Sequence, residues 1–210
     1  MSVIPDTRVQ QVIDRLERTR SFPTGSGPRD GDTDPHHFVE YGFSIHPDQG
    51  DLMYLLCRGI KATRVVDFAT SVGMSALYLA AAIRDNGGGV VIGSEYVAQK
   101  AEVARRNLAE AGLDAWLDLR VGDARLTLRD LGGPIDFALI DGWPTPSGPS
   151  LAREVVEIVA PQLRVGGYLL NDNAEPDYLE YIRDPRNGFA SMTLPIKRGT
   201  ELSLKLAPAA

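Results

Sequence analysis

The fold is decided by a stretch at residues 64–75, RVVDFATSVGMS, in which a short apolar run ends in Asp67 and small residues follow it. The β-branched run favours a buried strand, and the Ala- and Leu-rich sequence from Gly73 to Asp85 favours a helix. A strand that passes through a small-residue turn into a helix lets backbone amides and the positive end of the helix approach a ligand. The stretch therefore predicts a ligand site at the end of the first strand.

The same alternation of apolar strands and helices continues after this stretch. Such an alternation is typical of a parallel sheet that is covered on both faces. Two short runs near the C-terminus, joined by a short turn, predict an antiparallel hairpin. We therefore expect an α/β fold, a Rossmann-like, doubly wound, mostly parallel seven-stranded sheet with an antiparallel C-terminal hairpin strand. The predicted strands span residues 64–69, 90–95, 116–121, 135–141, 168–172, 190–195 and 201–206, and the predicted helices span residues 73–85, 97–111, 124–131 and 151–163.

The N-terminal part is organised differently. Apolar residues at helical spacing predict helices at residues 7–20 and 47–58, and Gly59 follows the second helix as a C-cap glycine would. Residues 21–35 hold Gly, Pro, Ser and Asp with almost nothing to bury, which predicts a mobile loop. We therefore divide the chain into an N-terminal segment, residues 1–35, whose helix is a candidate lid, and a ligand-binding domain, residues 36–210.

Composition and charge exclude several classes of protein. The 210 residues fit one domain, the hydrophobic share is 43%, and the formal net charge is −6. Nucleic acids and anionic membranes attract proteins with a positive face, so neither is expected as a partner. The single cysteine, Cys57, lies in an apolar helical stretch and is expected in the core. No secretory signal or membrane span is visible, so a cytoplasmic protein is expected.

Acidic residues stand at the ends of the predicted strands, where doubly wound sheets bind their ligands. Glu95 ends the second strand 22 residues after Gly73, a place from which a carboxylate can accept hydrogen bonds from both hydroxyls of a ribose. Asp123 and Ala124 follow the third strand and suit an adenine edge. Taken singly, Asp67 and Asp123 are equally well interpreted as helix caps, but together with Glu95 they favour a ribose-containing ligand. The absence of a G-x-G-x-x-G pattern disfavours a nicotinamide oxidoreductase.

The fourth and fifth strands end in polar residues of another kind. Asp141 and Trp143 follow the fourth strand, and Asp172 and Asn173 follow the fifth. Adjacent strand ends would bring together two carboxylates and an amide carbonyl, the oxygen ligands that suit Mg²⁺ or Ca²⁺. A metal there would lower the pKa of a substrate hydroxyl and make it a nucleophile. The alternative is that Asp172 and Asn173 only turn the chain before Pro176.

Five motifs in this order resemble those of class I S-adenosylmethionine-dependent methyltransferases, most closely the metal-dependent O-methyltransferases of the catechol and caffeoyl-CoA type. The resemblance covers residues 41–206, and residues 176–183 are also similar to the segment that follows the Asp-Asn pair in catechol O-methyltransferases. The motifs are specific because each falls at the end of a predicted strand. They are residues 67–75, Glu95-Tyr96, Gly122-Asp123-Ala124, Asp141-Gly142-Trp143 and residues 166–173.

The resemblance implies an S-adenosylmethionine-dependent O-methyltransferase domain at residues 36–210, which methylates a hydroxyl of a small catechol-like or phenolic acceptor with the help of Mg²⁺. It implies that Glu95 holds the ribose hydroxyls and that Ala124 and Trp143 lie at the adenine. Related enzymes include monomers and dimers, so a homodimer is a candidate assembly. The implied Mg²⁺ ligands are Asp141, Asp172 and Asn173; the further implied cofactor contacts are Asp67, Ala69, Thr70, Ser71, Gly73 and Ser75 around the methionine part, with Tyr96, Gly122, Asp123 and Asp141 elsewhere in the site.

The sequence departs from the catechol-type pattern in two places. A Lys follows the Asp-x-Trp triplet in that family and acts as a base, whereas Pro144 stands here. The acidic residue expected near the late hairpin is not evident at residues 191–195 either. Two alternatives therefore stay open: a metal-independent methyltransferase with a His base, and a catalytically inactive protein that binds S-adenosylmethionine. The acidic charge disfavours nucleic-acid methyltransferases.

In both the metal-dependent and the metal-independent enzyme, the proton of the acceptor hydroxyl would be removed by the metal, by solvent or by a histidine. His36, His37 and His46 flank the loop on the substrate side, and a His with its ordinary pKa can serve as a base. The alternative for each histidine is that it is a solvated loop residue without a role in catalysis. Asp141 and His46 are the predicted catalytic residues.

Overall fold

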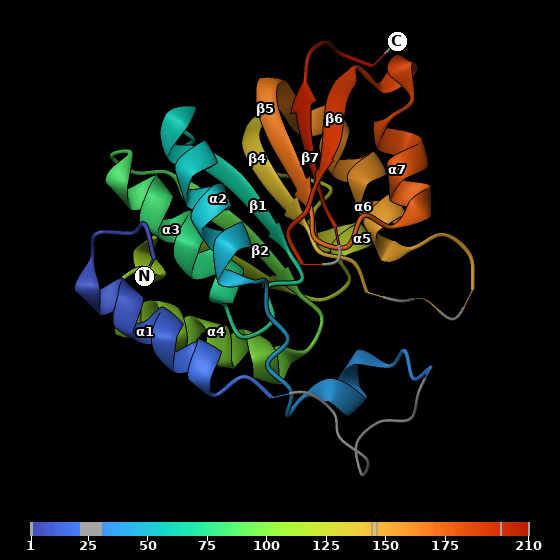
Figure 1. Cartoon of the computed structure of the whole chain (residues 1–210). Helices are drawn as coiled ribbons and strands as arrows, with labels where there is room; N and C mark the ends of the chain where they lie inside the picture. Colours follow the sequence, from blue (N-terminus) through green and yellow to red (C-terminus); the bar gives the residue numbers. More distant parts are fainter. Residues whose placement is uncertain (1, 22–30, 144, 146, 198, 210) are drawn as a thin grey trace.

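The computed structural model describes residues 2–21, 31–143, 145, 147–197 and 199–209. Within these residues the chain forms a seven-stranded sheet in the order β3-β2-β1-β4-β5-β7-β6 (Figure 1). β1 to β5 run parallel, and β7 runs antiparallel to both β5 and β6. The predicted fold class is therefore confirmed. The strands are β1 (Arg64–Phe68), β2 (Val90–Glu95), β3 (Leu117–Val121), β4 (Ile135–Ile140), β5 (Leu163–Asn171), β6 (Phe189–Leu194) and β7 (Thr200–Lys205).

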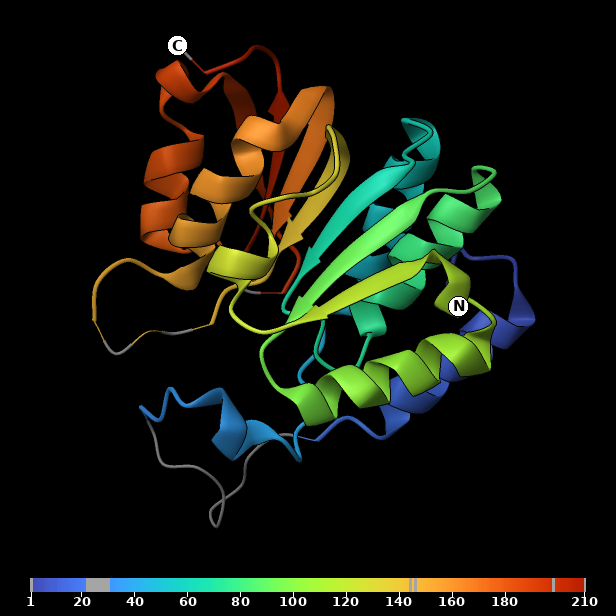
Figure 2. The ribbon, with the colours of Figure 1, turned by 180° about the vertical axis from the view of Figure 1, so that it is seen from behind.

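Helices cover both faces of the sheet (Figures 1 and 2). Strand side chains alternate between the two faces, so Val65 joins the core under one layer of helices and Val66 joins the core under the other. Both faces need apolar residues for this reason, which explains the near-continuous apolar runs. One layer holds α1 (Thr7–Arg18), α2 (Pro47–Gly59), α3 (Met74–Asp85) and α4 (Ala98–Ala111); the other holds α5 (Ala124–Thr127), α6 (Leu151–Val159) and α7 (Pro176–Ile182).

The N-terminal helix α1 belongs to the first layer. It packs against α3 and α4, and its buried face is made of Val9, Val12, Ile13 and Leu16. Most of the loop predicted at residues 21–35 lies outside the described residues, as does Pro144. The division of the chain at residue 35 stays a prediction.

Several predicted boundaries are wrong, among them the end of α1, which is Arg18 rather than residue 20. β5 begins at Leu163 rather than at residue 168, and α6 ends at Val159 rather than at residue 163. The strand continues through Gly166, whose φ of +81° accommodates a shift of register against β4, so this glycine marks an irregularity inside the strand. Gly59 is likewise not the C-cap glycine of α2, because the left-handed residue after that helix is Lys61, with φ of 53°.

Other differences concern short helices. α5 ends at Thr127, four residues before the predicted end, and the sequence pattern does not predict the helix α7, whose residues carry part of the family resemblance. Pro176 lies in the first turn of α7, where its missing N–H is not needed. No helix in the described part of the chain is long and apolar enough to cross a lipid bilayer.

Candidate cofactor and acceptor site

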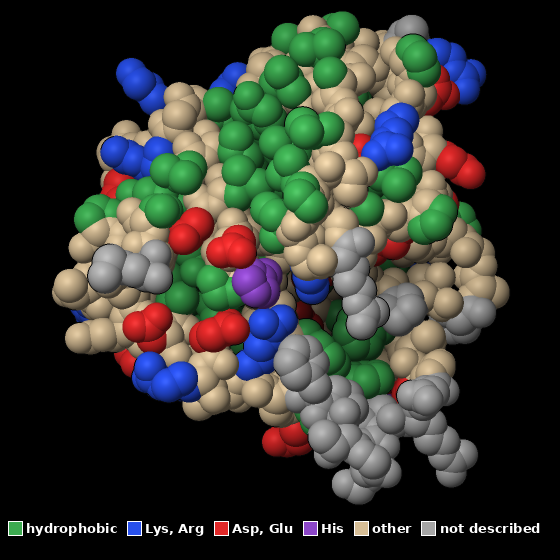
Figure 3. Space-filling model, viewed as in Figure 1, with side chains coloured by type: hydrophobic (Ala, Val, Ile, Leu, Met, Phe, Trp, Pro, Cys, Tyr) green, Lys and Arg blue, Asp and Glu red, His purple; other side chains and the backbone are tan. Residues whose placement is uncertain are grey.

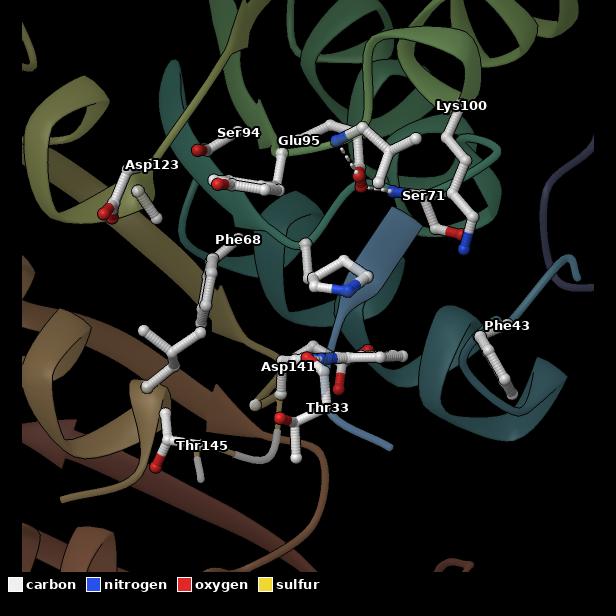
Figure 4. A pocket seen from close by; sticks show the side chains of 18 of the residues that line it. Thr33, Phe43, Phe68, Ser71, Ser94, Glu95, Lys100, Asp123, Asp141 and Thr145 are labelled. Carbon is white, nitrogen blue, oxygen red and sulfur yellow. Dashed lines mark hydrogen bonds between the residues drawn. The ribbon is translucent and has the colours of Figure 1, made fainter. Parts of the chain in front are cut away.

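A cleft of about 1040 Å³ opens at the carboxyl ends of the parallel strands. The order of the strands reverses between β1 and β4, which is where doubly wound sheets bind ligands. Figure 4 shows Asp123, Glu95 and Lys100 along one side of this cleft and Asp141 across from them. The structure therefore brings the predicted strand-end residues of β2, β3 and β4 around one space.

The turn after β1 forms part of the cleft wall and carries backbone strain. Ala69 and Ser71, which both line the cleft, have φ of 64° and 50°, a left-handed conformation that residues with a Cβ rarely adopt. The amides of Ala69 and Thr70 donate to the carbonyl of Ser94 on β2 at 3.0 and 3.1 Å, and these bonds hold the turn in place. Gly73 caps α3 with φ of +92° and packs against Ala104 of α4.

Asp67 lies beneath this turn, fully buried at the end of β1. Neither of its carboxylate oxygens has a hydrogen-bond partner among the described residues. Burial disfavours the charged form and raises the pKa of Asp67 to about 7. An ionisable group without a partner is unusual in a protein interior and is most often found at a functional site.

Glu95 ends β2 and organises two neighbouring segments. Its carboxylate accepts hydrogen bonds from the amide of Ser71 at 2.7 Å and from the amide of Val97 at 2.8 Å (Figure 4). The side chain lines the cleft and is almost fully buried. A carboxylate oxygen can accept more than one hydrogen bond, so Glu95 can still accept from a diol placed in the cleft.

The residues after β3 contribute a second wall. Asp123 and Ala124 both line the cleft, and Asp123 also caps α5 by accepting from the amide of Arg125 at 2.9 Å. A hydrogen bond from Arg125 lowers the pKa of Asp123. Tyr96 lies at the mouth of the cleft and is half exposed. Asp123 is thus both the cap of α5 and a residue of the cleft wall.

Aromatic side chains close the cleft on the side of residues 31–46. Phe38 and Phe43 pack edge to face or tilted against Trp143, with ring centroids 5.2 and 5.8 Å away. The indole N–H of Trp143 donates to the carbonyl of Thr33 at 2.9 Å, which fixes the ring. Lys100, a buried residue of α4 with its ammonium 5.2 Å from the centroid of the Phe43 ring, also lines the cleft. Lys100 and Phe43 were not predicted, because a single Lys or Phe carries no local signal.

The predicted metal ligands do lie together. Asp141, Asp172 and Asn173 all line the cleft, and the amide of Asn173 donates to Asp141 at 3.4 Å. Burial, and next the charge of Asp172, raise the pKa of Asp141 well above its ordinary value, whereas the charge of Lys197 opposes this shift. Glu175 stands beside the group and accepts from Asn173 at 3.3 Å.

Two further residues, which were not predicted, donate hydrogen bonds to the carboxylate of Asp172. The ammonium of Lys197 donates to one carboxylate oxygen, and the side-chain amide of Gln49 donates to the other at 2.5 Å. Among the described residues, no group of three His, Cys, Asp or Glu side chains is arranged to hold a metal. As the residues are arranged, a divalent cation does not fit at Asp172, because it would have to displace Lys197. The acidic strand ends were a signal that a cation had to be nearby, but nothing local identified this lysine.

The three histidines are placed differently. His36 lines the cleft with its ring 5.4 Å from that of Tyr96. His37 is exposed, and a hydrogen bond from its ring to Asp32 raises its pKa. His46 is not among the described residues that line the cleft; it precedes α2, and its ring lies 3.4 Å from the carboxylate of Asp48. The structure thus does not bring His46 together with Asp141.

Comparisons with known proteins agree with this geometry. The family described as "Methyltransferase domain" matches residues 68–174. A catechol O-methyltransferase of Mycobacterium tuberculosis is 33% identical over 145 residues, which are 64% of this chain and 63% of that protein. A catechol O-methyltransferase of Niastella koreensis is 30% identical over 141 residues, 62% of this chain and 63% of that protein. The matched region therefore spans less than two thirds of these relatives.

Solved structures share the fold. The O-methyltransferase from Bacillus cereus, in complex with SAH, has a TM-score of 0.68 at 20% identity, and the match covers 97% of this chain and 93% of that one. The O-methyltransferase TomG from Streptomyces achromogenes, in complex with SAM, has a TM-score of 0.67 at 20% identity over 98% of this chain and 100% of that one. With its motifs, its sheet and its family match taken together, the chain belongs to the methyltransferase-domain family and is a class I, catechol O-methyltransferase-like member.

Proposed function

We propose that the protein is an S-adenosylmethionine-dependent O-methyltransferase that acts on a hydroxyl of a small aromatic acceptor. The observation that carries the proposal is the position of Glu95, a buried carboxylate in the cleft that is fixed by two backbone amides at the end of β2. That is the place from which nucleotide-binding α/β folds hold a ribose. The catechol O-methyltransferase relatives support the reaction type.

The residues around the cleft fit the cofactor in three ways. Glu95 would accept from the ribose hydroxyls, and Ala124 and Trp143 would lie at the adenine. The turn from Ala69 to Gly73, whose residues Ala69 and Ser71 line the cleft, would lie beside the methionine part. The carboxyl group of Asp67 lies fully buried beneath that turn and does not itself line the cleft, but it would place an acidic group below the cationic part of the ligand.

Methyl transfer asks the protein mainly for alignment. When bound, the cofactor would supply a methyl group on a sulfonium. The acceptor oxygen would form the O–CH₃ bond as the S–CH₃ bond broke and its electron pair returned to sulfur, and the hydroxyl proton would leave to water. The chain would contribute acidic surroundings for the sulfonium and a closed aromatic wall for the acceptor. Phe43 and Trp143 form that wall, Phe38 packs against both, and the aromatic surface favours a flat, apolar acceptor ring. We do not include Mg²⁺ in this proposal because Lys197 lies on Asp172.

The test separates cofactor binding from turnover. Calorimetry with S-adenosylhomocysteine should show binding, and a panel of catechols and phenols should accept methyl groups. Glu95→Gln should weaken binding by about 10–100-fold, because a hydrogen bond to a charged group is lost. Glu102→Gln on α4, an exposed residue, is the matched control. Unchanged binding in Glu95→Gln would contradict the proposal, whereas tight binding without turnover on any acceptor would favour the inactive binding protein.

We further propose a homodimer. Tyr168, Leu170 and Leu202 pack on the core beneath α2, and their cross-strand partners Leu204 and Met192 share that face of the sheet. Figure 3 shows apolar side chains gathered over β5, β6 and β7 beside α2. An exposed apolar face of this kind is typical of a protein interface.

A further inference from the structure

We infer that the ammonium of Lys197 takes the place of a divalent cation at Asp172, so that the protein needs no metal and holds the acceptor hydroxyl through this lysine. The occupation of Asp172 by a chain cation follows from contacts described above. The role of Lys197 toward the acceptor rests on the proposed methyl transfer.

Both oxygens of the Asp172 carboxylate already accept hydrogen bonds from side chains of the protein. One oxygen accepts from Lys197 and the other from Gln49 at 2.5 Å, and the side chain of Asp172 is 2% exposed. A metal ligand must face the ion with an oxygen lone pair, and a positive charge that already lies at the carboxylate repels a second cation there. Here both oxygens already face hydrogen-bond donors of the protein, one of them positively charged.

The side chain of Gln49 is held in place by further hydrogen bonds. The amide of Gln49 also donates to the hydroxyl of Thr200 at 2.8 Å, and its carbonyl accepts from the amide of His46 at 2.8 Å. Gln49 is completely buried. It therefore ties the start of α2, the start of β7 and the end of β5 together, and it orients Asp172 toward Lys197.

The turn that carries Lys197 has a strained backbone. This residue lies between β6 and β7 with φ of 56°, in the left-handed region that a side chain with a Cβ rarely adopts. The amide of Gly199 donates to the carbonyl of Ile196 at 3.0 Å and closes the turn around it. Strained positions of this kind persist where the surrounding structure requires them, commonly at functional sites.

Lys197 lies in the part of the cleft where we place the acceptor, beside Asp141 and Asn173. Its side chain is 31% exposed and lines the cleft together with Asp141 and Asn173. An ammonium group has three N–H donors, and among the described residues only Asp172 accepts from it. The remaining donors can hold the oxygen of an acceptor hydroxyl, where a metal ion would otherwise have attracted it.

The experiment measures metal binding directly, without reference to turnover. Mn²⁺ is titrated into the full-length protein and free Mn²⁺ is followed by electron paramagnetic resonance. Wild type should not bind Mn²⁺ even at about 1 mM, where weak oxygen-ligand sites fill. Lys197→Met should gain binding because Asp172 is released, whereas Lys197→Arg, which keeps the charge, should not. Lys61→Met, which removes an exposed lysine outside the cleft, is the matched control.

Turnover gives a second readout. EDTA should leave wild-type activity unchanged, and Lys197→Met should lower kcat by about 10²-fold without weakening binding of S-adenosylhomocysteine. Saturable Mn²⁺ binding by wild type together with inhibition by EDTA would overturn the inference, and this measurement needs no variant. A folded Lys197→Met protein that binds no Mn²⁺ would overturn it as well. Failure of the proposed function is a different result, since it would appear as no binding of S-adenosylhomocysteine.

Discussion

Asp67 makes the stability of the unliganded protein depend on pH. Its ordinary pKa of 3.8 is raised to about 7 by burial. Between these values the folded protein keeps Asp67 protonated while the unfolded chain ionises it, so the folded state binds more protons and the free energy of unfolding falls as the pH rises. From about pH 7 upward the whole cost of roughly 4 kcal/mol applies.

The prediction is checked by urea unfolding of wild type and Asp67→Asn between pH 4 and pH 8. The variant should be the more stable protein at pH 8, and the difference between the two should shrink toward pH 4, because the amide is neutral throughout. Asp130→Asn, in which an exposed carboxyl is removed, serves as the control. A difference between wild type and Asp67→Asn that does not vary with pH would contradict the argument.

The contact between α2 and α3 depends on a residue without a side chain. A Cβ atom at Gly50 of α2 would lie within the ring of Tyr78, a fully buried residue of α3. Gly50→Ala should therefore push the helices apart and destabilise the protein by about 1–3 kcal/mol. Because Gly50 directly follows Gln49 in the first turns of α2, the same change should also loosen the hydrogen bond from Gln49 to Asp172.

A second glycine of the same helix provides the comparison. No atom lies within 4 Å of a Cβ at Gly59, so Gly59→Ala should leave the stability unchanged or raise it by up to about 1 kcal/mol. Thermal unfolding of both variants checks the pair. Equal melting temperatures for Gly50→Ala and Gly59→Ala would show that the close packing on Tyr78 does not limit the position of α2.

Elements with a strong local pattern were predictable from the sequence. β2 was predicted to the residue, because Val90 to Glu95 is an apolar run bounded by glycines and a polar turn. Gly112 ends α4 in the left-handed conformation, as a glycine after a periodic helix indicates. β5 was predicted too short because a glycine pair usually ends an element, whereas here Gly166 accommodates an irregularity within one.

At the scale of the whole molecule, the sequence revealed which residues stand at strand ends but not what they contact. Parallel strands end at one edge of the sheet, so Glu95, Asp123 and Asp141 could be placed around one cleft. The contact of Gln49 with Asp172 joins residues 123 positions apart and leaves no mark in any local pattern. Lys197 was missed for the same reason, because its role depends on how the hairpin folds back over β5.

The proposed assembly can be tested with one surface substitution. Met192 is 58% exposed on the apolar face of β6, and Met192→Asp should convert a dimer into a monomer because a charge would be buried at the interface. Leu126→Asp, at a similarly exposed residue of α5 in the opposite layer of helices, should not. Light scattering after size exclusion measures both. A wild-type protein that is monomeric at every concentration would contradict the proposal.

Residues other than glycine that have positive φ affect how the protein would respond to directed evolution. Five residues other than glycine have positive φ in the described chain, and three of them line the cleft: Ala69, Ser71 and Lys197. Glycine or asparagine at such positions relieves strain, so a selection for heat resistance alone would favour replacing them. Under the proposed function, variants obtained in this way should tolerate higher temperatures and methylate more slowly. The rim of the cleft is thus the place where resistance to heat and catalytic efficiency oppose each other.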